Sequence, residues 1–189
     1  ADMVPVYDSS GVATKKLSLK TMNLVKANQS TTSQGAGFAT DTYLTGSFVL
    51  FPSGSPAVGT IYRLIFDMTK TAAGTATPII NVRVGTAGTT ADTSRATLTF
   101  GAGTAVAATG LFEVICMFRT VGSGTSAVTQ TVSRLDSLPS TGMSSTIKSV
   151  SATSGGFDST VANLGIGVSF NGGTSFSGTV QLVRAELML

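Results

Sequence analysis

The chain has 189 residues, of which 42% are hydrophobic and only 11% charged, and its formal net charge is +3. It contains 30 Thr, 23 Ser and 22 Gly, one Cys, no His and no Trp. This composition predicts an all-β protein, because Thr favours strands while Gly and Ser favour turns, and the missing His excludes His-based triads and His metal sites.

We expect no cofactor, since one Cys can form neither an intramolecular disulfide nor a thiolate zinc site. We also expect no nucleic-acid partner, because twelve basic residues against nine acidic ones form no pronounced basic surface. No stretch approaches the roughly 20 apolar residues of a membrane span, so no membrane partner is expected. The first six residues lack the basic and apolar regions of a signal peptide.

Residues 1–42 differ from the rest and are predicted to form an N-terminal arm for attachment. Within them, the segment 15–26 alternates like a strand but could also place its apolar residues on one side of a helix. Residues 27–42 are polar and small, which is typical of a linker. We assign the contact with a partner protein to basic and apolar residues of the arm: Lys15, Lys16, Leu17, Leu19 and Lys20.

From residue 43 onward, short alternating segments are separated by turns rich in Gly, Ser and Pro. The clear segments are 61–68, 80–84, 97–100, 112–118, 164–170 and 180–188, and the weaker ones are 43–51, 126–135 and 145–152. No amphipathic segment of helix length lies between them. Residues 43–189 are therefore predicted to form an antiparallel, jelly-roll-like β-sandwich of about eight strands, with a barrel or an immunoglobulin-like sandwich as alternatives.

Two of these strands are apolar on both faces. The second face of 112–118 carries Ile115 and Met117 between charged residues, and that of 61–68 carries Ile61 and Ile65. A solvated strand face should be polar, so this face needs a cover. Either a loop of the same chain or a neighbouring subunit supplies it; we favour the subunit and assign Ile115 and Met117 to partner binding.

Catalytic and metal-binding patterns are absent from the sequence, and we predict that the protein is not an enzyme. Cys116 falls on the core face of its strand and is expected to be inert. Asp92 and Asp158 fit turn-stabilising positions better than a calcium site, which needs a denser set of oxygen ligands. The other acidic residues of the domain show no spacing that forces a catalytic pair; they include Asp67, Glu113, Asp136 and Glu186.

The segment 62–93, YRLIFDMTKTAAGTATPIINVRVGTAGTTADT, resembles a domain that recurs in virion proteins of tailed bacteriophages. The stretches GLFEVICMFRTVGSGTSAVTQ at 110–130, GFDSTVANLGIGVSFNGG at 156–173 and VQLVRAELML at 180–189 are similar to the same group, so the resemblance covers about residues 43–189. The opening VPVYDSSGVATKKLSLKTM resembles N-terminal attachment segments of phage fibre and decoration proteins.

This resemblance implies a jelly-roll domain, often trimeric, on the exterior of the virion. The expected function is that of a capsid decoration, cement, head-fibre or tail-fibre protein, attached through its arm to the major capsid protein or another virion protein. The alternative is a receptor-binding domain of a tail fibre that recognises a host glycan or protein through the loops 85–93 and 101–110. A polysaccharide depolymerase is a third possibility, without a carboxylate pair to support it.

Overall fold

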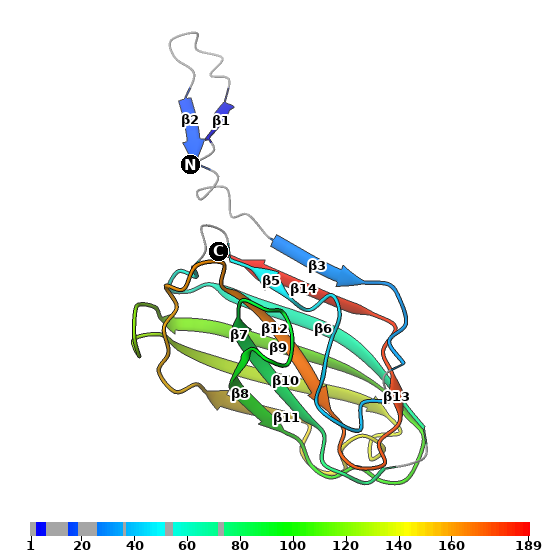
Figure 1. Ribbon diagram of the computed structural model, residues 1–189. Coiled ribbons are helices and arrows are strands. Elements are labelled where there is room, and N and C mark those ends of the chain that lie inside the picture. Colours follow the sequence, from blue (N-terminus) through cyan, green and yellow to red (C-terminus); the bar gives the residue numbers. More distant parts are fainter. Residues whose placement is uncertain (1–2, 7–14, 19–25, 36, 52–54, 72–73) are drawn as a thin grey trace.

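The computed structural model describes residues 3–6, 15–18, 26–35, 37–51, 55–71 and 74–189, and these form strands and loops without a helix (Figure 1). The seven-stranded sheet has the order β11 (Ser149–Thr153), β10 (Val128–Leu138), β9 (Ala108–Thr120), β6 (Ile61–Lys70), β14 (Val183–Met188) and β3 (Lys26–Ser30), with β13 (Gly178–Thr179) also beside β6. The five-stranded sheet has the order β4 (Thr42–Tyr43), β12 (Gly165–Asn171), β7 (Ile79–Gly85) and β8 (Thr93–Thr99), with β5 (Val49–Leu50) also beside β12. A separate two-stranded sheet pairs β1 (Met3–Val6) with β2 (Lys15–Ser18).

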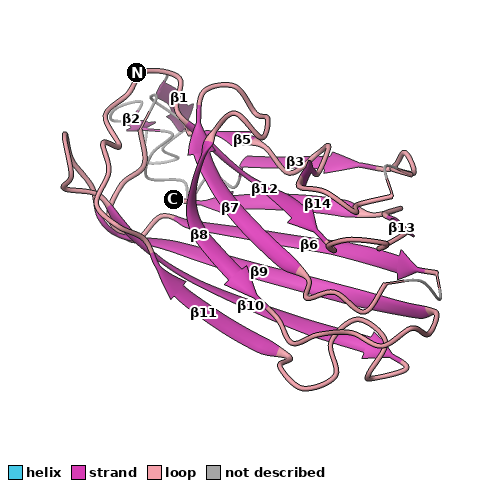
Figure 2. Cartoon of the chain, turned by 60° about the horizontal axis from the view of Figure 1, so that its bottom comes forward, coloured by secondary structure: helices cyan, strands magenta, loops and turns pink. Residues whose placement is uncertain are grey.

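The two larger sheets form an antiparallel sandwich, which confirms the predicted fold class (Figure 2). Strands β3, β14, β6 and β9 lie side by side in one sheet, and β4, β12, β7 and β8 lie side by side in the other. The chain passes repeatedly from one sheet to the other, and its first and last sandwich strands, β3 and β14, are neighbours. This interleaving is the jelly-roll arrangement. The hairpin of β10 and β11 widens the larger sheet beyond β9.

The core lies between the sheets and follows the alternation seen in the sequence. Every second residue of β6 and β9 is buried. Phe66 and Phe112 on these neighbouring strands stack with ring centroids 4.9 Å apart, and Phe170 of the opposite sheet meets the Phe112 ring edge-on at 5.5 Å. Such aromatic contacts join the two sheets, since buried rings contribute large apolar areas and favour edge-to-face geometry.

The prediction that 27–42 form a linker is wrong, because this segment belongs to the sandwich. Strand β3 pairs with β14 over five residue pairs, from Ser30 opposite Val183 to Lys26 opposite Leu187. Farther along, Phe38 is fully buried in the core. Within the described residues, the sandwich therefore begins at Lys26 rather than at residue 43. A polar strand suits this place, because a sheet edge is held by backbone hydrogen bonds and needs no continuous apolar face.

Residues 41–51, which we call the strap, form the edge of the small sheet beside β12, and the side chains of Tyr43 and Phe48 lie over the outer face of that strand. Strand β12 is buried on both faces as a result. Its outward positions are Gly165, Gly167 and Ser169, and a Cβ at Gly165 or Gly167 would collide with Phe48 or Tyr43 of the strap. Small residues on β12 thus allow Tyr43 and Phe48 of the strap to pack directly on this strand.

Candidate functional site

Five apolar side chains lie together on the outer face of the large sheet: Ile61, Ile115, Met117, Val132 and Met188, which we call the outer patch. The register places Ile115 opposite Val132, Met117 opposite Ile61, and Ile61 opposite Met188. The exposed fractions of Ile115, Met117 and Val132 are 40%, 39% and 39%. No described segment of the chain covers them, so the predicted second apolar face is exposed to solvent.

Charged pairs of both signs lie beside the outer patch. Arg63, next to Ile115 in the register, binds Glu113 with an Nη2–Oε1 distance of 2.7 Å. Arg184 binds Glu186 at 2.8 Å on the neighbouring strand β14. An apolar patch with paired charges beside it resembles a protein interface, in which apolar side chains form the centre and polar ones the rim.

A second site is a pocket of about 260 Å³ at the end of the sandwich where the loop 85–93 meets residues 158–164, and we call it the Arg95 pocket. Its lining residues are Val84, Gly85, Thr86, Ala91, Asp92, Thr93, Arg95, Asp158, Val161 and Leu164. Val84 and Leu164 are buried, whereas Val161 is exposed at the rim. The pocket therefore combines an apolar part with one cationic and two anionic side chains.

The carboxylate of Asp92 holds the loop 85–93 in place. Its Oδ1 accepts a hydrogen bond from the backbone N–H of Ala87 at 2.9 Å, and its Oδ2 accepts one from Gly88 at 2.7 Å. Gly85 makes room for this carboxylate, since a Cβ there would overlap the Asp92 side chain. The expected turn-stabilising role of Asp92 is confirmed, and the loop shape is fixed by charge-assisted bonds.

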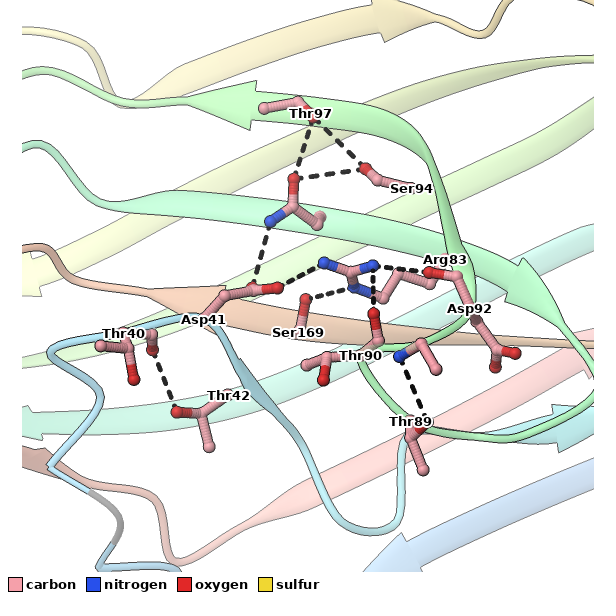
Figure 3. A network of polar contacts seen from close by, with 12 residues as sticks. Thr40, Asp41, Thr42, Arg83, Thr89, Thr90, Asp92, Ser94, Thr97 and Ser169 are labelled. Atoms are coloured by element: carbon pink, nitrogen blue, oxygen red, sulfur yellow. Dashed lines mark hydrogen bonds and ion pairs between the residues drawn. The ribbon is translucent and has the colours of Figure 1, made fainter.

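Arg83 of β7 ties the same loop to the strap (Figure 3). Its Nη1 donates to the carbonyl oxygens of Thr90 and Asp92 at 2.9 and 2.6 Å, and its Nε donates to Ser169 Oγ at 2.8 Å. Its Nη2 forms an ion pair with Asp41 of the strap. All of these contacts use one guanidinium group, so loop, strap and sheet are braced by a single side chain.

Arg95 is the extra residue of a β-bulge. Arg83 pairs with Ser94 and Val82 with Ala96, which leaves Arg95 without a partner on β7. Bulges redirect a side chain, and they occur often beside functional sites. The guanidinium carbon of Arg95 lies 4.5 Å from the centre of the Phe157 ring. Its Nε is buried and has no hydrogen-bond partner among the described residues.

Asp158 is partly exposed and also lines the pocket. Its Oδ1 accepts hydrogen bonds from the backbone N–H of Thr160 at 2.8 Å and from the Thr160 hydroxyl at 2.7 Å. These bonds hold the pKa of the Asp158 carboxyl below its usual value, so the group is ionised at neutral pH. The predicted Asx-type turn at this position is confirmed.

The predicted contact residues of the sheet lie together in the structure, whereas those of the arm are only partly described. Ile115 and Met117 are brought together with Ile61, which the sequence also placed on a second apolar face, and with Val132 and Met188, which it did not. Lys15, Lys16 and Leu17 belong to strand β2, while Leu19 and Lys20 lie outside the described residues. The attachment role of the arm stays a prediction.

The two loops expected to form one receptor surface lie at opposite ends of the sandwich. The loop 85–93 joins β7 to β8 at the end where Val84 pairs with Thr93, whereas residue 101 follows β8 at the end where Ile79 pairs with Thr99. The prediction of a joint contact surface is therefore wrong. The partners of 85–93 at its own end are residues 158–164, which are distant in sequence and carry no motif that points to this contact.

The remaining candidate groups of the sequence analysis are Cys116 and the acidic residues. Cys116 is fully buried, and desolvation raises the pKa of its thiol, as expected for an inert core residue. Within the described ranges, no three acidic or Cys side chains gather as metal ligands. The described part of the chain likewise contains no helix long and apolar enough to cross a membrane.

Comparison with known proteins finds no matching family model and no matching curated protein. Among solved structures, the chain is similar to the CBM2 module of the evolved Dit protein of Lactobacillus casei BL23 phage J-1. The two share 11% sequence identity over 87% of this chain and 90% of that chain, with a TM-score of 0.33. A similarity at this level assigns neither a family nor a function.

Proposed function

We propose that this chain is a non-enzymatic structural protein of a bacteriophage particle, which assembles with copies of itself through the outer patch. The resemblance of 62–93 to phage virion domains and the jelly-roll topology support this class of protein. The observation that carries the proposal is the exposure of Ile115, Met117 and Val132 on one sheet face. In its full form the proposal is a trimeric decoration, cement or fibre protein on the virion exterior.

The physical reason for association is the apolar area of the outer patch. Burial of such area contributes roughly 25 cal/mol per Å², and a stable interface buries about 800 Å² on each partner. In such an interface the outer patch would form the dry core. The neighbouring pairs Arg63–Glu113 and Arg184–Glu186 then lie at its rim, where charges of both signs favour a defined orientation over non-specific adhesion.

The test is the mass of the full chain in solution by size-exclusion chromatography with light scattering. We expect three times the chain mass of 19.1 kDa at micromolar concentration. The double variant Ile115→Lys, Met117→Lys is expected to dissociate, because a charge in a dry interface core is strongly unfavourable. Val106→Lys, at a residue that is also 40% exposed but lies in the loop before β9, is the matched control and should stay assembled. A monomeric wild type, or an assembled double variant, contradicts the proposal.

The arm residues supply the attachment part of the proposal. A triple charge reversal at Lys15, Lys16 and Lys20 is expected to abolish co-sedimentation of the protein with phage particles that lack it. The same variant should assemble like the wild type, because none of the three lysines belongs to the outer patch. If the variant still co-sediments with the particles, these three lysines are not required for attachment.

A second candidate function is the receptor-binding domain of a tail fibre, and the Arg95 pocket favours it. Loop 85–93 is shaped in advance by Asp92 and Arg83, which is the arrangement that lowers the entropic cost of binding. Labelled full-length protein is expected to bind host cells, and Arg95→Met is expected to remove that binding. Equal binding by the variant would exclude the pocket as the receptor contact.

A further inference from the structure

Arg95 is the basic residue in the lining of the pocket, and it donates no hydrogen bond to any described residue. A guanidinium carries five N–H donors. The buried Nε has no partner, and no described residue forms an ion pair with this side chain. A buried donor without a partner costs about 1–3 kcal/mol. A ligand oxygen placed beside Arg95 would remove this cost.

Phe157 holds the guanidinium of Arg95 in position without using its donors. The ring lies against one side of the group, with 4.5 Å between the guanidinium carbon and the ring centre. Cation–π contacts of this kind are attractive within about 6 Å. Partial burial lowers the pKa of Arg95 from its ordinary value, but a guanidinium remains charged at neutral pH. Arg95 is therefore a fixed donor group at the pocket wall.

The acceptors of the pocket are the carboxylates of Asp92 and Asp158. Both oxygens of Asp92 accept hydrogen bonds from the loop amides, while Asp158 is partly exposed and ionised. The pocket thus carries charges of both signs, so neither an anion nor a cation would meet charges of the opposite sign alone.

A neutral group that donates and accepts at once fits this arrangement. Hydroxyl groups have that property, and two neighbouring hydroxyls can accept from Arg95 and donate to Asp158. The apolar part formed by Val84, Val161 and Leu164 offers a surface for the C–H groups of the same ligand. At about 260 Å³, the pocket is slightly smaller than ordinary small-molecule sites of roughly 300–1,000 Å³. It would hold one ring and leave the rest of a longer chain in solvent.

We propose that the Arg95 pocket binds one residue of a neutral saccharide, with Arg95 donating to one hydroxyl and Asp158 accepting from its neighbour. This inference supplies the ligand class for the second candidate function, on which its biological role rests. It does not depend on assembly through the outer patch.

The test uses the full-length protein and saturation-transfer difference NMR with defined probes. The neutral probes are the methyl glycosides of glucose, galactose, mannose, rhamnose and N-acetylglucosamine, and the anionic probes are glucuronate and inorganic phosphate. We expect a signal from at least one neutral glycoside, with a Kd in the millimolar range. Arg95→Met, which keeps an apolar stem over Phe157, is expected to weaken binding by about tenfold or more, as is Asp158→Asn. Arg119→Gln, an exposed arginine of β9 outside the pocket lining, is the control and should bind like wild type.

Three results overturn the inference: no signal from any neutral glycoside at millimolar concentration, equal binding by Arg95→Met, or binding of the anionic probes alone. The cell-binding assay distinguishes failure of the saccharide inference from failure of the receptor function. Host binding that persists in Arg95→Met leaves a receptor that uses another surface. Glycoside binding without host binding leaves a saccharide pocket whose target is not on that host.

Discussion

The phenol oxygen of Tyr43 occupies the place that a Cβ at Gly167 would take. The Tyr43 side chain of the strap therefore lies against the outer face of β12 at a distance that only a residue without a side chain allows. This contact explains why β12 is buried on both faces although it belongs to the smaller sheet. It also connects the strap to the Arg95 pocket, because Asp41 of the same strap binds the arginine that braces the loop 85–93.

Gly167→Ala is expected to displace the strap and to lower the free energy of unfolding by about 2 kcal/mol or more, the usual range for overpacking at a rigid contact. Gly155→Ala is the control, since a Cβ there meets nothing within 4 Å. The free energy of unfolding of the control should equal or slightly exceed that of the wild type. Urea unfolding at one fixed protein concentration measures both, and equal stability of the two variants would show that the strap can shift without cost.

The two buried tyrosine hydroxyls are expected to differ in their contribution to stability. Burial raises the pKa of both phenols, so both keep their protons at neutral pH. Tyr62 donates to the carbonyl oxygen of Ser47 at 2.6 Å, whereas the Tyr43 hydroxyl has no hydrogen-bond partner among the described residues. Tyr62→Phe should therefore cost about 1–2 kcal/mol, and Tyr43→Phe should be neutral or stabilising. Thermal unfolding of the pair tests this, and a reversed order would contradict the assigned contacts.

Local alternation explains how much of the fold could be predicted from the sequence. Strands such as β6 and β9 carry their burial pattern residue by residue, so Ile115 and Met117 were identifiable as a second apolar face before any neighbour was known. The companions of these residues were not identifiable. Val132 joins the outer patch through the register between β9 and β10, which a single strand does not encode.

Strand β3 and the Arg95 pocket show where sequence reasoning fails. The segment Lys26–Ser30 has no apolar alternation, because it is held at the sheet edge by backbone bonds to β14 that do not depend on side-chain type. Arg95 and Asp158 are far apart in sequence and meet only because the two sheets bring β8 and the loop before β12 to one end. Neither position belongs to a short motif.

Arg83→Met is expected to destabilise the protein by about 3 kcal/mol, since it removes the cationic partner of Asp41 and the donor to two loop carbonyls. The side chain of Arg83 is only 11% exposed. Arg184→Met breaks the pair with Glu186, where Arg184 is 54% exposed, and should cost less than about 1 kcal/mol. Hydrogen exchange should also accelerate in the loop 85–93 of Arg83→Met alone. Unchanged exchange there would show that Asp92 suffices to hold the loop.

Lys70 provides a pH-dependent contribution to stability. Its Nζ donates to the carbonyl oxygens of Thr104 and Gly142 at 2.6 and 2.9 Å, and burial lowers its pKa from the ordinary value of 10.5. Between the folded pKa and 10.5, the unfolded chain binds more protons than the folded one, so the contribution of Lys70 to stability rises with pH. The stability of wild type minus that of Lys70→Met should therefore increase from pH 7 to pH 10. If this stability difference stays constant or falls with pH, the Lys70 ammonium is solvated rather than buried in the folded protein.

Cys116 is expected to be unreactive until the sandwich opens. The thiol is fully buried, desolvation raises its pKa, and thiolate formation is required for attack on a disulfide reagent. The chain has a single cysteine, so labelling with a chromogenic disulfide reports on this position alone. The labelling rate in native buffer should be about tenfold lower than in urea, or lower still. The reason is that β9 lies in the centre of the large sheet and becomes accessible only when the whole core opens. Fast labelling of the native protein would mean that β9 separates from β10 locally, and the outer patch, which spans these two strands, would then have no rigid base for an interface.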